Sequence, residues 1–213
     1  MELEKIKLNL GCGGDTPYGW LNVDCSPNVL LAKIPGNKLI KDILYKFNFI
    51  AKEAYLANWS SSVYFCDLNN DFPKIQLNTC SVIYSSHFLE HIPHSKAVKL
   101  IDKCYMVLAG GGILRLAVPD LYREAKEYVE KIEKALTEGN EETEASENFI
   151  RHMVSRSKRH SHLWMYDVFS LSKLLRDIGF VNIVRKEFLE SDISNIELLE
   201  KREDSLFLEC RKP

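Results

Sequence analysis

One stretch near the start of the chain, residues 7–24, constrains the fold more than any other. It reads KLNLGCGGDTPYGWLNVD, so an alternating apolar run breaks off in glycines and a second apolar run ends at Asp24. Glycines directly after a strand let a ligand approach backbone that no Cβ shields. An acidic residue at the end of the next strand can bind the hydroxyls of a ribose. The stretch therefore predicts the floor of a site for a nucleoside cofactor.

The rest of the chain alternates between strand and helix patterns. We expect strands at 6–10, 20–23, 63–66, 81–84, 113–118, 181–184 and 206–208, and helices at 39–55, 93–108 and 171–178. Residues 120–148 should form a surface helix that continues into an acidic linker. Such alternation is typical of an α/β fold with a mostly parallel sheet. The segment between the last two strands contains no convincing crossover helix, so we expect the final strand to run antiparallel to its neighbours.

Local signals refine this expectation. Only nine residues separate the first two strands, fewer than the dozen or so that a parallel crossover needs, so any helix there must be short. Apolar residues at helical spacing predict a wide buried face on the helix at 39–55. Ser95 is expected to cap the next helix and Gly110 to end it. Asp120 fits either an N-cap or a contact to the acceptor.

Composition excludes several classes of protein. The net charge of −2 gives no overall basic field that would attract nucleic acid. No apolar run reaches the roughly 20 residues that span a bilayer, and the first residues lack the features of a signal peptide. The six cysteines form no CxxC pair, and several lie within predicted strands or helices, which suits buried, reduced thiols better than a disulfide framework. We therefore expect a cytoplasmic protein without a membrane span, and 213 residues are most simply one domain.

Three motifs carry a resemblance to a known family. Residues 9–13, NLGCG, followed by 19–24, GWLNVD, resemble the first motif of class I S-adenosylmethionine-dependent methyltransferases. Residues 85–92, SSHFLEHI, resemble the signature that follows the fourth strand in the methyltransferase type 11 group, and 107–115, VLAGGGILR, resemble its loop into the fifth strand. The first motif and a late histidine-rich segment also resemble a subgroup often associated with surface-polysaccharide gene clusters.

The resemblance implies a Rossmann-like fold with a mostly parallel, seven-stranded sheet and an antiparallel last strand. It implies a single methyltransferase domain over residues 1–213, with a helical insertion at 119–166 after the fifth strand. S-adenosylmethionine would be the cofactor. Residue 16, where a third glycine would complete the dinucleotide motif GxGxxG, is threonine, which counts against a nicotinamide-dependent oxidoreductase.

The resemblance also implies which residues bind the cofactor. The backbone at Gly11 and Gly13 would approach the methionine and ribose, Asp24 would accept the ribose hydroxyls, and Asp67 would accept the adenine amino group. The remaining members of the implied set are Leu68 beside the adenine, Ser85 at the methionine end, and Asn9 and Cys12 within the first motif. Asn9 departs from the acid that many relatives carry there. The spacing of 13 from Gly11 to Asp24 is also shorter than the roughly 20 residues of a dinucleotide fold, so Asp42 is the alternative to Asp24.

Histidines are the candidate catalytic groups. A hydroxyl or amine acceptor must lose a proton during methyl transfer, and histidine is the natural base near neutral pH. All six histidines fall in two clusters, one at 87, 91 and 94 and the other at 152, 160 and 162. Ligands of a doubly wound sheet bind beyond the carboxyl ends of its strands, so the first cluster should border the cofactor. We predict His87 or His162 as the base; the alternative is that these histidines only pack or face solvent.

We predict no metal site. His87 and His91 are four residues apart, but Glu90 does not occupy the position that the HExxH motif requires. No cysteine lies nearby at a spacing typical of metal ligands.

The favoured function is methyl transfer from S-adenosylmethionine to a hydroxyl of a small-molecule or saccharide acceptor. The acid-free segment from 148 to 166 could bind a phosphorylated acceptor through its basic residues Arg151, Arg156, Lys158 and Arg159. Two alternatives remain open. The same segment could bind RNA in an RNA methyltransferase, or the chain could be a non-catalytic subunit that binds S-adenosylmethionine.

Overall fold

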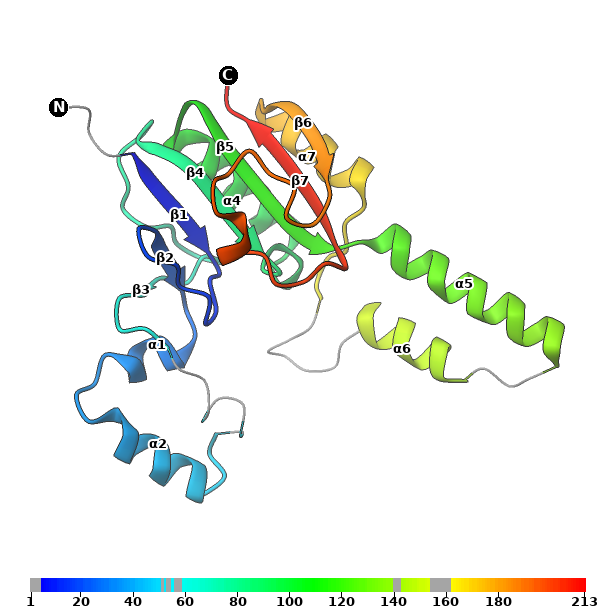
Figure 1. Cartoon of the computed structure of the whole chain (residues 1–213), viewed down its shortest axis with the longest axis horizontal. Helices are drawn as coiled ribbons and strands as arrows, with labels where there is room; N and C mark the ends of the chain where they lie inside the picture. Colours follow the sequence, from blue (N-terminus) through cyan, green and yellow to red (C-terminus); the bar gives the residue numbers. More distant parts are fainter. Residues whose placement is uncertain (1–4, 51, 53–54, 56–58, 140–142, 154–161) are drawn as a thin grey trace.

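Seven strands form one mixed sheet in the order β3-β2-β1-β4-β5-β7-β6 (Figure 1). A computed structural model describes residues 5–50, 52, 55, 59–139, 143–153 and 162–213. The strands are β1 (Ile6–Leu10), β2 (Leu21–Asp24), β3 (Tyr64–Phe65), β4 (Cys80–Ser86), β5 (Leu108–Pro119), β6 (Val181–Lys186) and β7 (Ser205–Arg211). Strands β1 to β5 pair in parallel, while β7 runs antiparallel to both β5 and β6. The predicted α/β sheet with an antiparallel last strand is confirmed.

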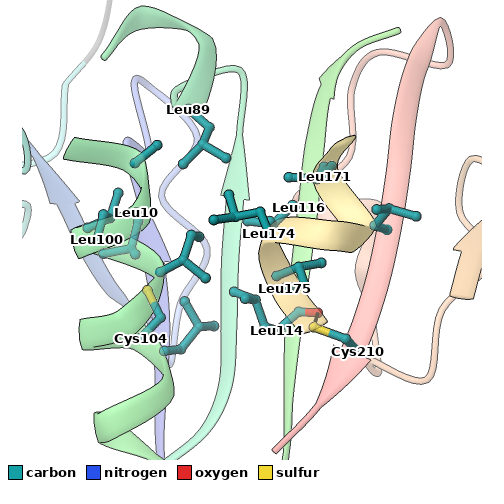
Figure 2. Close-up of a cluster of buried hydrophobic side chains, with 14 of the residues drawn as sticks. Leu10, Leu89, Leu100, Cys104, Leu114, Leu116, Leu171, Leu174, Leu175 and Cys210 are labelled. Atoms are coloured by element: carbon teal, nitrogen blue, oxygen red, sulfur yellow. Dashed lines mark hydrogen bonds between the residues drawn. The ribbon is translucent and has the colours of Figure 1, made fainter. Parts of the chain in front are cut away.

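Helices α4 (His94–Val107) and α7 (Val168–Ile178) cover one face of this sheet. Figure 2 shows Leu100 and Cys104 of α4 and Leu174 and Leu175 of α7 among side chains from β1, β5 and β7. Apolar residues recur every three to four positions along both helices, so each helix presents one apolar stripe to the strands. This face holds the main hydrophobic core of the described chain.

The opposite face of the sheet is covered by the connection between β6 and β7. Ile193, Ile196 and Leu199 of this connection, which includes the short helix η2 (Ile196–Leu198), pack on Val82 and Tyr84 of β4. Residues 11–20, between β1 and β2, form turns and no helix, as their short length predicts. An apolar sheet face must be covered by some element. In this chain the connection between β6 and β7 covers the sheet face opposite α4 and α7 (Figure 1).

A buried arginine holds that connection in place. Arg115, in the middle of β5, is fully buried and pairs with the carboxylates of Glu200 and Glu209. Its guanidinium also donates to the carbonyl of Glu187 at 3.3 Å. A charge buried away from water requires such partners. The ionic network explains why an arginine interrupts an otherwise apolar strand.

The predicted ends of the helix at 93–108 are partly wrong. Helix α4 begins at His94, and Ser95 does not cap it, because the carbonyl of Pro93 already closes the first turn with Lys96 and Ala97. The helix ends at Val107, where Leu108 adopts extended backbone and starts β5. Gly110 therefore lies within a strand and does not end the helix.

The predicted buried face of the helix at 39–55 is also wrong. The chain forms α1 (Pro27–Ala32), which the sequence analysis missed, and α2 (Asn37–Lys46). Every residue of α2 is described and none is buried; Leu39, for example, is 67% exposed. The helix ends at Lys46 with Phe47 as its C-cap, and Asn48 has a left-handed φ of 59°. Amphipathic spacing shows that a helix has an apolar face, but not that another element covers it.

After β5 the chain forms a helical insertion, as predicted. Helices α5 (Leu121–Glu138) and α6 (Thr143–Met153) contact each other, and the rings of Tyr128 and Phe149 stack with centroids 4.6 Å apart. Asp120 caps α5 by accepting from the Tyr122 backbone N–H at 3.1 Å, and Gly139 ends it with a φ of 68°. A second helix, α6, therefore begins within the stretch where an acidic linker was expected. No described helix of this chain is both long and apolar enough to cross a membrane.

Candidate functional site

The turn after β1 requires glycine at Gly11. Its φ of 65° is left-handed, and a Cβ added there would lie 2.7 Å from the Cβ of Phe88. Phe88 lies two residues beyond the end of β4, so the segments that follow the two strands pack against each other at this point. Gly13 also has a positive φ, of 54°, but a Cβ there would meet no atom within 4 Å. The backbone at Gly13 is therefore open to a ligand.

The side chain of Asn9 holds the turn between β1 and β2 in shape through hydrogen bonds. Its side chain is 2% exposed, and its amide donates to the Asp15 carbonyl at 2.9 Å and to Oδ1 of Asn22 at 3.0 Å. A carboxylate at this position would supply neither hydrogen bond. These bonds explain why an amide suits position 9, where many relatives of the resembled family carry an acid. The contact of Asn9 with the cofactor stays a prediction.

Asp24 faces the same turn from the end of β2. Its Oδ2 accepts from the Gly13 N–H at 2.9 Å and its Oδ1 accepts from the Ser26 N–H at 2.6 Å. The alternative acid, Asp42, lies on α2 and accepts from the hydroxyl of Tyr55 at 2.9 Å. The geometry favours Asp24 over Asp42 as the acid that serves the glycine turn.

Asp67 lies just beyond β3, beside Asp24. The N–H of Cys66 donates to the Asp24 carbonyl at 3.1 Å, which ties the two strand ends together. The Asp67 carboxylate accepts from the Asn69 N–H at 3.1 Å and from the side-chain amide of Asn70 at 2.7 Å. Leu68, the predicted neighbour of the adenine, is 4% exposed and packs in the main core.

Cys12 and Ser85 are both buried at this end of the sheet. Burial, aided by the charge of Asp24, raises the pKa of the Cys12 thiol to about 12. A thiol with such a pKa stays protonated near neutral pH and is a poor nucleophile. The Ser85 hydroxyl oxygen is buried as well and has no hydrogen-bond partner among the described residues.

A cavity of about 290 Å³ lies at the carboxyl ends of β1 and β4. It is lined by Asn9, Gly11, Cys12, Gly13, Gly14, Asp15, Tyr84, Ser86, His87, Leu199, Lys201 and Arg202. Five of the ten predicted site residues are in this lining, and the other five lie outside it, namely Asp24, Asp67, Leu68, Ser85 and His162. Hollows of about 350 and 410 Å³ also occur at α5 and α6, and none of the predicted site residues lines them.

Of the lining residues that the sequence analysis did not predict, Leu199, Lys201 and Arg202 are the ones far in sequence from every predicted site residue. They belong to the β6–β7 connection, which reaches the cavity because Glu200 pairs with Arg115 in β5. The two partners are 85 residues apart. An isolated arginine within an apolar strand was the available signal, since such a charge requires a partner from elsewhere.

The two histidine clusters meet in space. The carbonyl of Glu90, in the short helix η1 (Leu89–His91), accepts from the N–H of Leu163 at 2.7 Å and from that of Trp164 at 3.3 Å. The rings of His91 and His162 then lie with centroids 5.2 Å apart. The other basic residues singled out from the sequence, Arg156, Lys158, Arg159 and His160, and the side chains of Arg151 and His152, lie outside the described residues.

Glu90 is the central side chain of this cluster. It is fully buried, with Oε1 3.3 Å from Nδ1 of His87 and 3.7 Å from Nε2 of His91. Neither carboxylate oxygen accepts a hydrogen bond from a described residue. Nearby Tyr166 has a raised pKa because its hydroxyl is buried and because Glu90 is negatively charged. The sequence analysis considered Glu90 only as a mismatch to a metal motif.

His87 connects this cluster to the cavity. Its φ of 48° is left-handed, and its backbone N–H donates to the Ala117 carbonyl at 2.9 Å. Its Nε2 lies 2.7 Å from Oγ of Ser205, whose own hydroxyl donates to the Arg202 carbonyl at 3.2 Å. The other ring nitrogen, Nδ1, faces the Glu90 carboxylate at 3.3 Å, so His87 links the wall of the cavity to this buried acid.

Solved structures share this arrangement of strands and helices. No protein-family model matches the chain, and no curated protein does. A methyltransferase from Archaeoglobus fulgidus described as SAM-dependent superposes with a TM-score of 0.50 over 98% of this chain and 86% of its own, at 11% identity. The fold is that of the SAM-dependent methyltransferases. A second methyltransferase of this fold, a possible histamine N-methyltransferase from Thermotoga maritima, has a TM-score of 0.52 and 13% identity, with 100% of this chain and 84% of its own covered.

Proposed function

We propose that this chain transfers the methyl group of S-adenosylmethionine to a hydroxyl of a small-molecule or saccharide acceptor. The observation that carries the proposal is the cavity at the carboxyl ends of β1 and β4, with the glycine turn as its floor and His87 in its wall. Ligands of parallel α/β sheets bind at this edge. We further propose one methyltransferase domain over residues 1–213, with the insertion at 119–166 on the acceptor side.

The residues at the carboxyl ends of β1 to β4 suit S-adenosylmethionine. Gly13 offers backbone that no side chain shields, and Ser85 offers a buried hydroxyl whose oxygen has no partner among the described residues. Each oxygen of Asp24 accepts one backbone hydrogen bond and retains a lone pair for a ribose hydroxyl. Asp67 would bind the adenine amino group and Leu68 would support the ring, while Asn9 and Cys12 hold the shape of the turn.

When bound, S-adenosylmethionine would supply a methyl group on a positively charged sulfur. The acceptor oxygen would bond to the methyl carbon as the carbon–sulfur bond breaks, which leaves S-adenosylhomocysteine. The protein must align the acceptor and accept the proton that its hydroxyl loses. Of the two predicted bases, His87 is favoured because it lines the cavity. His87 would accept the proton on its ring, and the Glu90 carboxylate, 3.3 Å from Nδ1, would stabilise the resulting cation.

Two cations add to the recognition of an acceptor. Lys201 and Arg202 line the same cavity, so it suits a ligand that carries a carboxylate or a phosphate. A phosphorylated sugar would satisfy both the cations and the need for a hydroxyl. The resemblance of the first motif to a subgroup associated with surface polysaccharides also supports a saccharide.

Binding of S-adenosylhomocysteine tests the cofactor site. We expect this product to raise the melting temperature of the wild-type protein and of Asp42→Ala, but not that of Asp24→Ala. Asp42 is a matched control because it is an acid in the same region that accepts a hydrogen bond from Tyr55. A wild-type protein whose melting temperature does not respond would contradict the proposal.

A further inference from the structure

Three side chains outside the lining of the cofactor cavity converge on one point. A carboxylate oxygen of Glu90 and one ring nitrogen each from His91 and His162 all lie within 4.8 Å of one another. Metal bonds to such atoms are about 2.0–2.2 Å long, so small rotations of the two rings bring all three donors onto one ion. We propose that Glu90, His91 and His162 bind one divalent transition-metal ion of the zinc class.

The buried carboxylate is independent support for this site. Glu90 is 0% exposed, and neither of its oxygens accepts a hydrogen bond from the described part of the chain. An ionised carboxylate in such a place requires a compensating positive charge. A metal ion bound between Glu90 and the two histidines supplies that charge directly at the carboxylate.

The backbone preorganises the three ligands. Glu90 and His91 are neighbours in η1, which fixes their relative position. The carbonyl of Glu90 accepts from the N–H groups of Leu163 and Trp164, so the residue that supplies the carboxylate also anchors the segment that carries His162. A site whose ligands are held by the fold loses little conformational entropy when it binds an ion.

The ligand set indicates the kind of metal. Magnesium and calcium prefer sites built from oxygen, whereas imidazole nitrogens suit zinc and other late first-row ions. Three protein ligands leave a coordination position open, as catalytic sites do. The side chain of His91 is 31% exposed, so an ion can enter from solvent.

The role of the ion rests on the proposed function, although its binding does not. An acceptor hydroxyl on the open coordination position would have a lowered pKa and would lose its proton more readily to His87. The prediction of no metal site considered cysteines and the HExxH motif. It therefore overlooked a glutamate that becomes a ligand only because the chain folds back at residues 162–164.

Metal titration of the chelator-treated full chain tests the site. We expect one Zn²⁺ per chain in a competition titration, and Co²⁺ in its place to give the visible absorption of a low-symmetry site. Glu90→Gln and His162→Gln should each weaken Zn²⁺ binding by more than about 100-fold, since outer-shell partners alone are worth about 10–100-fold. His94→Gln is the matched control, because His94 packs on Trp164 outside the cluster and should leave binding unchanged.

Absence of stoichiometric binding, or equal affinity in the wild type and His162→Gln, would overturn the proposal. His162 is only partly buried, so His162→Gln still tests the site if Glu90→Gln fails to fold. S-adenosylhomocysteine binding is measured on the same samples. Zinc binding without it would leave the metal site standing and contradict the proposed function, and the reverse result would contradict the metal site alone.

Discussion

The backbone N–H of Gly13 donates a 2.9 Å hydrogen bond to Oδ2 of Asp24, across the turn between β1 and β2. This bond joins the two features that first indicated a nucleoside site, the glycines after one strand and the acid after the next. It holds the carboxylate against the backbone that a cofactor would approach. The turn, the acid and the cavity beside them therefore form one unit, and each of its supports can be tested separately.

Gly11→Ala should destabilise the protein strongly. The new Cβ would lie 2.7 Å from Phe88, and alanine would have to adopt a φ of 65°. The backbone cost and the overpacking together should lower the free energy of unfolding by about 2–4 kcal/mol. Urea denaturation measures this change. Gly13→Ala is the control, since its Cβ meets no atom within 4 Å and it should lose only about 1–2 kcal/mol.

Arg115→Met should cost about 3–5 kcal/mol of unfolding free energy, because it leaves Glu200 and Glu209 buried without their cation. The triple variant Arg115→Met, Glu200→Gln, Glu209→Gln should recover part of this loss. Arg123→Met is the comparison, since its pair with Asp204 is exposed and should contribute about 0–1 kcal/mol. A loss below about 1 kcal/mol for Arg115→Met would show that the network does not hold the β6–β7 connection.

Asp167→Ala should remove about 1 kcal/mol of stability, because its carboxylate caps α7 by accepting from the Ser170 N–H at 2.7 Å. The backbone and hydroxyl of Ser170 hold the pKa of Asp167 below its usual range. The cap therefore contributes fully above about pH 4, the unfolded value, and its contribution is lost as the pH falls through the folded value.

Unfolding measured from neutral to acidic pH should thus show the difference between wild type and Asp167→Ala shrinking in acid. Asp177→Ala, at the other end of α7, is the control. Among the described residues Asp177 pairs with Lys173 alone, and both side chains are exposed, so its loss should change stability by less than about 0.5 kcal/mol at any pH. A difference for Asp167→Ala that does not depend on pH would contradict the capping account.

The parts of this protein that could be predicted from sequence depend on neighbouring residues. Short-range signals predicted the glycine turn, the strand that ends at Asp24 and the helix that ends before Gly179. The structure contains all three features. The alternation of elements also predicted the mixed sheet. These features follow from backbone preferences and from burial on one face of an element.

The parts that escaped prediction depend on residues far apart in the chain. Lys201 and Arg202 reach the cavity because Glu200 pairs with Arg115, and Glu90 meets His162 because Leu163 and Trp164 bond to its carbonyl. The exposure of α2 was missed for the same reason, since its sequence shows an apolar face without showing what lies against it. Such long-range pairings leave no periodic signal in the sequence.

Transfer of a radiolabelled methyl group from S-adenosylmethionine tests the central claim most directly. The purified chain would be incubated with separate pools of nucleotide sugars, glycans, small phosphorylated metabolites and RNA, with Asp24→Ala as the inactive control. We predict label in a saccharide or small-molecule pool that is lost with Asp24→Ala. Label confined to RNA, or no transfer to any pool by a protein that binds S-adenosylhomocysteine, would contradict the proposed function.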